Sequence, residues 1–571
     1  MRTSICDDGK PSTVLTFPAR PTPILSPILR LAFICILVTC NLHTCPLLLA
    51  ADDGYPRQPA FDVQHYRLQI SISDTTDSID GKTEVQVRVV DPAVRRIIFD
   101  LKDMWVSEVR EAGDSAAFSH LEDRLAIDLQ KTYERDSQTN ITILYRGAPQ
   151  EGLIISTNQH GARTFFADNW PNRASFWFPS IDHPSDKATV EVTITAPQKY
   201  EVIANGRLLL TRDNDAMTRT WYWAESVPIP TYCTVFGAAD FSITDLPSNG
   251  IAPLSYNVYP EDSSRAQINF GRANKIVEYF TKVIGPYPYE KLALVQSTTR
   301  YGGMENAGAI FFAEQSVAGD RNIDGTVAHE IAHQWFGDSV TESDWHHLWL
   351  SEGFSTYFQM LFTEHADGRD AFRAEVLRNK DNYLEFAENN RRPIIDTTIF
   401  DYPRLLNANN YQKAALVLHA LRHQVGNVAF FRGVREYYIA HRDANALTAD
   451  FQKVMETVTG QPLGWFFDQW LWRGGHPELA IRWSWDKTTQ KIVLQISQQQ
   501  PEEPFRFRLP IKVASSGRVS ELIIEVDKRE EKVELAAQVK PQQIFVDPEE
   551  TLLKTLTMAE ATNDEISGKS Q

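Results

Sequence analysis

The stretch from residue 329 to residue 353 constrains this chain more than any other. It reads His-Glu-Ile-Ala-His from His329 to His333, and Glu352 follows after eighteen intervening residues, within Trp-Leu-Ser-Glu-Gly. Residues four apart lie on one face of a helix, so the imidazoles of His329 and His333 can bind one metal ion together. Glu330 lies about 100° further round the same helix. That position suits a general base beside the metal rather than a ligand.

A third ligand completes this site. Glu352 opens the next helical pattern, predicted over residues 352–362, and can return a carboxylate to the metal. Two His and one Glu leave a fourth position for water, which is typical of a catalytic zinc site rather than a structural one. We therefore predict one Zn²⁺ per chain, bound by His329, His333 and Glu352.

Other readings of this stretch fit less well. The metzincin pattern requires Gly and His where this chain has Phe336 and Ser339, which excludes that class. His346 and His347 lie nearby and are alternative donors for the third position. A helix whose histidines are only core residues is the alternative without a metal.

A second motif lies upstream, at residues 301–308, and reads Tyr-Gly-Gly-Met-Glu-Asn-Ala-Gly. Gly302 and Gly303 lack a Cβ, so the backbone there can approach a ligand closely. A strand-like run follows at residues 309–312. Glu305 beside that strand can bind a free ammonium group, which would separate an exopeptidase from an endopeptidase.

Together the motifs resemble the zinc aminopeptidase family that includes membrane alanyl aminopeptidase and leukotriene hydrolase. The family carries Gly-(Ala/Gly)-Met-Glu-Asn, His-Glu-x-x-His and a later Glu in this order and spacing, and the resemblance covers about residues 55–550. It implies that substrate is bound by Gly302, Gly303, Met304, Glu305 and Asn306, with Glu305 on the amino group.

The resemblance also implies a role for Tyr411, which composition alone does not select among 19 tyrosines. The family's transition-state tyrosine lies in Tyr-x-Lys-Gly, and this chain has Tyr-Gln-Lys-Ala at that place. We therefore expect Tyr411 to donate a hydrogen bond to the developing oxyanion.

The chain departs from the family pattern at several positions. Ser351 stands where the family has Asn, and His346-His347 replaces a common Asn-Asp pair. Both changes lie beside the ligands and bear on the hydrogen bonds that orient them. A family residue from the N-terminal domain that contacts the substrate amine has no clear equivalent, and Asp168 and Asn169 are the candidates.

The first 51 residues differ in composition from the rest. Basic residues precede a short apolar run at residues 31–38, and Ala50-Ala51 precede acidic Asp52-Asp53. A run this short does not cross a hydrocarbon layer of about 30 Å, and the order fits a secretory signal peptide cleaved near Ala50 or Ala51. We expect export to the periplasm or the extracellular space. Retention by an uncleaved anchor, or lipoprotein-type cleavage at Cys40, are the alternatives.

Cysteine usage agrees with loss of this segment, because four of the five cysteines lie within it and only Cys233 remains. The chain therefore depends on ordinary hydrophobic cores, for which 43% hydrophobic residues in a length of 571 are ample. The net charge of −17 argues against nucleic acid or an anionic membrane as a partner. We infer no obligatory protein partner.

Hydrophobic periodicity divides the rest into three blocks. Apolar and polar residues alternate from Tyr66 to Ile72, and similar runs at 85–89 and 190–194, with turn signals such as Asp80-Gly81, indicate β-structure. Helical patterns begin at 266–284 and dominate 324–472, and strand-like runs return at 492–496, 505–509 and 522–526.

With the family resemblance, these blocks predict a multidomain α+β fold. We expect a signal peptide (1–51), a saddle-like N-terminal β-sheet domain (52–250), a thermolysin-like, mainly helical zinc domain (251–475), a C-terminal β-sandwich-like domain (476–555) and a polar tail (556–571).

These features predict a zinc aminopeptidase that acts on peptides with a free N-terminus. Zinc would lower the pKa of its water towards about 7, Glu330 would take the water's proton, and Tyr411 would stabilise the oxyanion. A thermolysin-like endopeptidase and a catalytically inactive scaffold are the alternatives, and epoxide hydrolysis is a further activity that the sequence leaves open.

Overall fold

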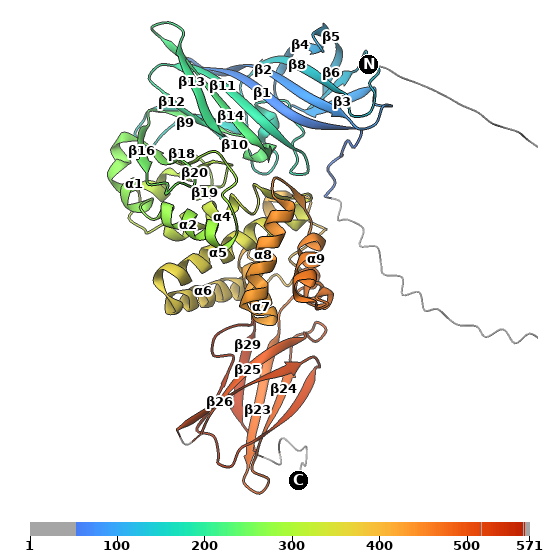
Figure 1. Cartoon of the computed structure of the whole chain (residues 1–571), viewed down its shortest axis with the longest axis vertical. Coiled ribbons are helices and arrows are strands. Elements are labelled where there is room, and N and C mark those ends of the chain that lie inside the picture. The colour runs from blue at the N-terminus through green and yellow to red at the C-terminus, as the bar shows by residue number, and fades with distance from the viewer. Residues whose placement is uncertain (1–52, 516, 563–564, 566–571) are drawn as a thin grey trace, which may run out of the picture. The chain divides into compact units, whose positions relative to one another are not determined.

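The computed structural model describes residues 53–515, 517–562 and 565. The expected signal peptide and its cleavage site at Ala50 or Ala51 lie outside these residues, as does the end of the expected polar tail. None of the helices in the described part of the chain has the length and apolar content that a membrane span requires. The predicted order of a β-rich, a helical and a second β-rich block is confirmed (Figure 1).

The N-terminal block is built around an eight-stranded sheet with the order β13-β14-β11-β1-β2-β8-β4-β5. The predicted alternation is present in its first strand, where Tyr66, Leu68 and Ile70 are buried and the residues between them are not. The strands are β1 (Phe61–Ser73), β2 (Thr76–Val89), β4 (Trp105–Glu111), β5 (Asp114–Ser115), β8 (Gln138–Gly147), β11 (Lys187–Pro197), β13 (Arg207–Asp213) and β14 (Thr218–Pro230).

Two smaller sheets complete the N-terminal block. The four-stranded sheet has the order β12-β15-β10-β9, and the three-stranded sheet has the order β3-β7-β6. Their strands are β9 (Gly152–Thr157), β10 (Arg163–Asp168), β12 (Glu201–Ala204) and β15 (Phe236–Ala239), and β3 (Arg96–Asp100), β6 (Ala117–Leu121) and β7 (Arg124–Asp128).

The turn predicted at Asp80-Gly81 is wrong. Both residues lie inside β2, where Gly81 pairs with Ile70 of β1. A Cβ on Gly81 would lie 2.3 Å from Cζ of Tyr145, so glycine is needed there because the tyrosine ring crosses the backbone. The ring comes from β8, which pairs with β2, and this contact is not visible in the local sequence.

The middle block holds a five-stranded sheet with the order β16-β17-β18-β20-β19. Its central strands are parallel and buried on both faces. Leu294 and Ile310 pack into a core shared with the helices, whereas Val295 and Phe311 pack into the core of the N-terminal block. The strands are β16 (Ser242–Leu246), β17 (Leu254–Val258), β18 (Leu292–Ser297), β19 (Gly303–Met304) and β20 (Ala309–Ala313). The sheet begins with β16, before residue 251, where the zinc domain was expected to start.

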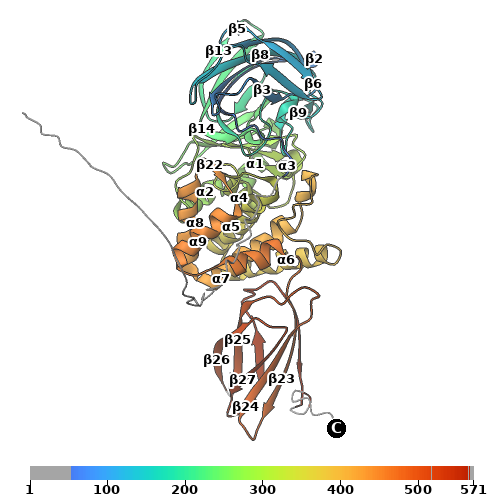
Figure 2. The same ribbon diagram turned by 90° about the vertical axis from the view of Figure 1, so that its right-hand side faces the viewer.

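Helices make up the remainder of the middle block (Figure 2). The helical structure predicted over 266–284 is present as two helices, which residues 270–272 separate. The helices are α1 (Ser263–Asn269), α2 (Ala273–Val283), α3 (Glu314–Ala318), α4 (Asp324–His333), α5 (Trp349–Asp367), α6 (Arg369–Ala387), α7 (Ala414–Val425), α8 (Asn427–His441), α9 (Thr448–Thr459) and α10 (Gly464–Phe467), with a π-helical turn, η6 (Asn409–Lys413), before α7. A short ladder joins β21 (Val340–Glu342) to β22 (Ala444–Ala446).

The C-terminal block consists of two sheets with the orders β27-β24-β23-β29 and β26-β25-β28. The last strand, β29, pairs in parallel with the first, β23, so residues 556–560, which were expected in the polar tail, belong to this sheet. The strands are β23 (Glu478–Asp486), β24 (Lys491–Gln498), β25 (Phe507–Ser515), β26 (Arg518–Val526), β27 (Glu530–Ala536), β28 (Gln543–Val546) and β29 (Thr555–Glu560).

Candidate metal and active site

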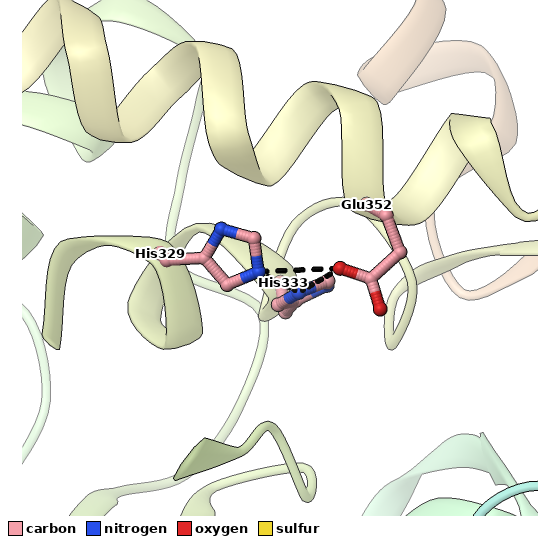
Figure 3. A group of neighbouring side chains, drawn as sticks. All are labelled: His329, His333 and Glu352. Atoms are coloured by element: carbon pink, nitrogen blue, oxygen red, sulfur yellow. Dashed lines mark hydrogen bonds and ion pairs between the residues drawn. The ribbon is translucent and has the colours of Figure 1, made fainter. Parts of the chain in front are cut away.

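Helices α4 and α5 bring together three side chains that could hold a metal ion, His329, His333 and Glu352 (Figure 3). His329 Nε2 lies 3.0 Å from His333 Nε2, and Glu352 Oε2 lies 3.2 Å from the first and 3.3 Å from the second. Ligands about 2.1 Å from a tetrahedral ion are separated by about 3.4 Å. The three atoms therefore fit around one ion of zinc's size with little adjustment, and the donor set of two imidazoles and one carboxylate suits zinc.

The second nitrogen of His333 is held by hydrogen bonds. His333 Nδ1 lies 2.9 Å from Ser351 Oγ and 3.1 Å from the carbonyl oxygen of Phe336. A proton on Nδ1, donated to this carbonyl, leaves Nε2 free to bind a metal. Ser351, where the resembled family has Asn, thus still provides a polar partner for the ligand.

Glu330 lies beside the ligands on α4 and is 6% exposed. Burial raises the pKa of its carboxyl well above the usual range, and the nearby carboxylates of Glu305 and Glu352 raise it further. Strand β19 runs against this side chain, because a Cβ on Gly303 would lie 2.3 Å from Glu330 Oε1. A Cβ on Gly302 would have only Ser316 Oγ within 4 Å, at 3.9 Å.

Tyr411 lies on the turn η6, on the other side of the third ligand. Its hydroxyl donates to Glu352 Oε1 at 2.6 Å, which leaves Oε2 facing the two histidines. Its ring is stacked on His329, with centroids 6.0 Å apart. Burial raises the pKa of the phenol well above its usual range, so Tyr411 remains a hydrogen-bond donor at neutral pH.

Hydrogen bonds between the backbone of residues 305–308 and Gln334, which directly follows α4, hold Glu305 beside this helix. Gln334 Nε2 donates to the carbonyl oxygen of Glu305 at 2.7 Å, and Gln334 Oε1 accepts from the backbone N–H of Gly308 at 2.8 Å. Burial raises the pKa of the Glu305 carboxyl to about 7. Asn306 is fully buried and does not line the cavity.

Sequence reasoning missed Gln334, although it directly follows His333. Besides its bonds to Glu305 and Gly308, Gln334 Nε2 donates to Asp338 Oδ2 at 2.7 Å. Asp338 in turn accepts from the Sγ of Cys233 at 3.3 Å, and its carbonyl oxygen accepts from Lys187 Nζ at 2.8 Å. Gln334 therefore joins the end of α4 to the segment 305–308 directly, and to the N-terminal block through Asp338. Only the partners of its side chain reveal this role.

The other predicted candidates lie outside the cavity. Asp168 is paired with Arg173 at 2.9 Å, and Asn169 bonds Trp177 and the carbonyl oxygens of residues 231 and 234. His346 bonds the carbonyl oxygen of residue 399, and His347 bonds the hydroxyl of residue 448, so neither histidine is directed to the metal ligands.

The assembled residues surround a cavity of about 260 Å³. Four of its lining residues, Trp170, Tyr301, Thr326 and Leu406, were not predicted as site residues. Tyr301 and Thr326 lie in or beside the two motifs in the sequence, whereas Trp170 and Leu406 come from distant segments. The lining residues are Trp170, Tyr301, Gly302, Gly303, Met304, Glu305, Thr326, His329, Glu330, His333, Glu352, Leu406 and Tyr411.

Comparison with known proteins identifies the family. Residues 269–470 match the peptidase family M1 domain and residues 62–233 match the peptidase M1 N-terminal domain, together well over half of the chain. The chain belongs to peptidase family M1, as the motifs predicted.

Among similar proteins is the glutamyl aminopeptidase of Homo sapiens, 28% identical over 388 residues, which are 64% of this chain and 40% of that protein. Similar structures include a point mutant of the M1 zinc metallopeptidase from Deinococcus radiodurans, with a TM-score of 0.66 and 25% identity over 74% of this chain and 97% of that chain. Aminopeptidase A from Legionella pneumophila has a TM-score of 0.79 and 18% identity over 88% of this chain and 60% of that chain. The chain spans about half the length of the curated relatives that it matches.

Proposed function

We propose that this chain is a zinc aminopeptidase that hydrolyses the N-terminal bond of peptides. The observation that carries the proposal is the placement of Glu305 in the same cavity as the His329, His333 and Glu352 cluster. A carboxylate that binds the substrate's ammonium group at this place restricts cleavage to the first peptide bond. The names of the family and of the relatives support the same conclusion.

Zinc held by the three ligands would polarise a water molecule and the scissile carbonyl. Glu330 accepts the proton of the attacking water and delivers it to the leaving amine. Its buried position supports this role, because burial raises the pKa of its carboxyl above the usual range and so makes the carboxylate a stronger base for the water's proton.

Tyr411 stabilises the negative charge that develops on the carbonyl oxygen. In the described structure its hydroxyl is bonded to Glu352 Oε1. The hydroxyl must therefore turn from the carboxylate to the oxyanion during the reaction, which makes the contact strongest in the transition state.

The test is the product pattern of one peptide in free and N-acetylated form. Acetylation removes the ammonium group and leaves the Glu305 carboxylate without its partner, so cleavage is expected to fall by a factor of about 100 or more. Mass spectrometry should show a ladder shortened one residue at a time from the free peptide. Internal fragments from the acetylated peptide would instead indicate a thermolysin-like endopeptidase.

Glu305→Ala is the matching variant. It should raise KM for the free peptide and reduce the difference between the two peptides while zinc stays bound, because Glu305 is assigned to the substrate and not to the metal. We also propose that the protein is exported after cleavage near Ala50 or Ala51. N-terminal sequencing of the protein from its native source tests this directly.

A further inference from the structure

Apart from the residues assigned to the metal, the water, the oxyanion and the substrate amine, only uncharged residues of the described chain line the cavity. Trp170 packs edge-on against Tyr301, with ring centroids 6.2 Å apart, and against Trp345 at 5.6 Å. Trp170 and Met304 are each 3% exposed, so packing fixes them in place. We call Trp170, Tyr301, Met304, Thr326 and Leu406 the apolar wall; Tyr301 and Thr326 also carry hydroxyl groups.

Two arginines lie behind the apolar wall, and carboxylates already pair both of them. The Arg173 guanidinium is 5.9 Å from the ring centroid of Tyr301, but its Nη2 lies 2.9 Å from Asp168 Oδ1. Arg300 Nη1 lies 2.6 Å from Glu151 Oε2, and the backbone N–H of Arg300 donates to Asp168 Oδ2 at 3.4 Å. We call Glu151, Asp168, Arg173 and Arg300 the charge cluster; its two positive and two negative charges cancel.

A substrate side chain in this cavity therefore meets no free positive charge from the described residues. Burying a carboxylate without a cation is costly, and the other charged groups lining the cavity include the carboxylates of Glu305, Glu330 and Glu352. Among the described lining residues, a basic side chain meets only these three carboxylates, which are already assigned to the substrate amine, the attacking water and the metal. An apolar side chain gains about 25 cal/mol per Å² of surface removed from water and can contact the rings of the wall.

We propose, on the basis of the aminopeptidase function, that this chain selects uncharged and mainly apolar N-terminal side chains. The charge cluster excludes acidic ones, because Glu151 and Asp168 cancel the charges of its two arginines. Arg173 lies beside the Tyr301 ring, and Arg300 precedes Tyr301 in the chain. Glu151 and Asp168 are thus specificity-determining residues, although neither lines the cavity.

Paired aminoacyl amides test the preference with the zinc-loaded enzyme. Glu and Gln amides differ in charge at nearly equal size, and Leu and Ala amides differ in apolar volume. We expect kcat/KM for Gln to exceed that for Glu at least about tenfold, and Leu to exceed Ala at least about tenfold. A Glu amide cleaved as fast as the Gln amide, or faster, would overturn the proposal.

A variant tests the charge cluster itself. Glu151→Gln removes one negative charge and leaves the cluster with a net charge of +1, so the Glu-to-Gln ratio of kcat/KM should rise several-fold at low salt and fall back as salt is added. Glu134→Gln, which removes an exposed carboxylate in the loop between β7 and β8, is the control and should leave the ratio unchanged. An unchanged ratio in Glu151→Gln contradicts the role given to the cluster.

A binding assay separates this inference from the proposed function. If no amide is cleaved by zinc-loaded protein, the aminopeptidase proposal fails. The thermal shift produced by free leucine, glutamine and glutamate at equal concentration still reports on the cavity. Leucine should stabilise the protein most and glutamate least, and equal stabilisation by glutamate would overturn the preference.

Discussion

At the scale of single residues, the proposed function gives Glu330 a different role from the proposed ligands His329, His333 and Glu352, although all four line one cavity. His329→Ala, His333→Ala and Glu352→Ala should each lose zinc and turnover together, because each removes a donor from the ion. Glu330→Gln should lose turnover and keep zinc, because it keeps the shape of a side chain that binds no metal. Zinc content measured by atomic emission beside kcat checks this, and loss of zinc in Glu330→Gln would contradict the division of roles.

The pair Gly302 and Gly303 offers a finer test of how the base is positioned. The Cβ that Gly303→Ala adds would lie only 2.3 Å from Glu330 Oε1, so the carboxylate must move. Misplacement of a reacting group by about 1 Å costs about 100-fold in rate, and kcat is expected to fall by that order.

Gly302→Ala is the matched control, because its added Cβ meets nothing closer than 3.9 Å. Its kcat should stay within a few-fold of the wild type. Equal losses in the two variants would mean that the flexibility of the loop matters, and not the contact with Glu330.

The elements that carry the site could be predicted to different extents. The helical spacing of His329 and His333 is a local property, and the sequence is sufficient to find it. Tyr411 required the family resemblance, and Trp170 and Leu406 remained unassigned, because they reach the cavity through contacts between distant segments. Gly81 was misread for the same reason, since the Tyr145 ring that requires glycine comes from another strand.

Gln334 connects α4 to the loop that carries Glu305. The reaction requires the residues of α4 and Glu305 to keep their relative positions. Gln334→Leu removes the bonds to the carbonyl of Glu305 and to the N–H of Gly308 and leaves these buried groups unpaired. We expect kcat/KM for free peptides to fall by about 10- to 100-fold, and the discrimination against acetylated peptides to weaken.

Zinc content should remain that of the wild type, since Gln334 is not a ligand. The ratio of kcat/KM for free and acetylated peptides measures the effect on Glu305 specifically. A variant with an unchanged ratio but a lower melting temperature would show that Gln334 contributes to stability only.

At the scale of the whole molecule, a buried lysine lies where the middle and C-terminal blocks face each other. Lys413 is 0% exposed, and its Nζ lies 5.6 Å from the ring centroid of Tyr383. Burial lowers its pKa to about 7, although Glu502 of the C-terminal block raises it in part. Since the unfolded chain binds this proton more tightly, stability rises with pH from about 7 to the ordinary lysine pKa of about 10.4.

Lys413→Met removes this penalty and keeps most of the volume. The variant should gain stability relative to the wild type, by a few kcal/mol at pH 6 at most and by little near pH 10. Melting temperatures across this pH range measure the difference, with Lys453→Met on the exposed face of α9 as control. A gain that is equal at both ends of the range would contradict the assigned pKa.

A segment at the start of the described chain fastens the first two blocks together. Asp53 Oδ2 lies 2.7 Å from His183 Nε2 in the N-terminal block and accepts from the backbone N–H of Trp345 in the middle block at 3.1 Å. Tyr402 donates to the Asp53 carbonyl oxygen at 2.8 Å. The active-site cavity draws Trp170 from one of these blocks and its metal ligands from the other, so its shape depends on this junction.

The bond between Cys233 and Asp338 has a practical consequence. Burial raises the pKa of the Cys233 thiol well above its usual range, so native protein carries almost no thiolate at this position. Residues 52–571 contain no other cysteine. Cysteines introduced at exposed Thr211 and Ser520 would then be the two sites that a maleimide dye labels. Such a pair would allow single-molecule fluorescence to follow the separation of the first and last blocks during turnover.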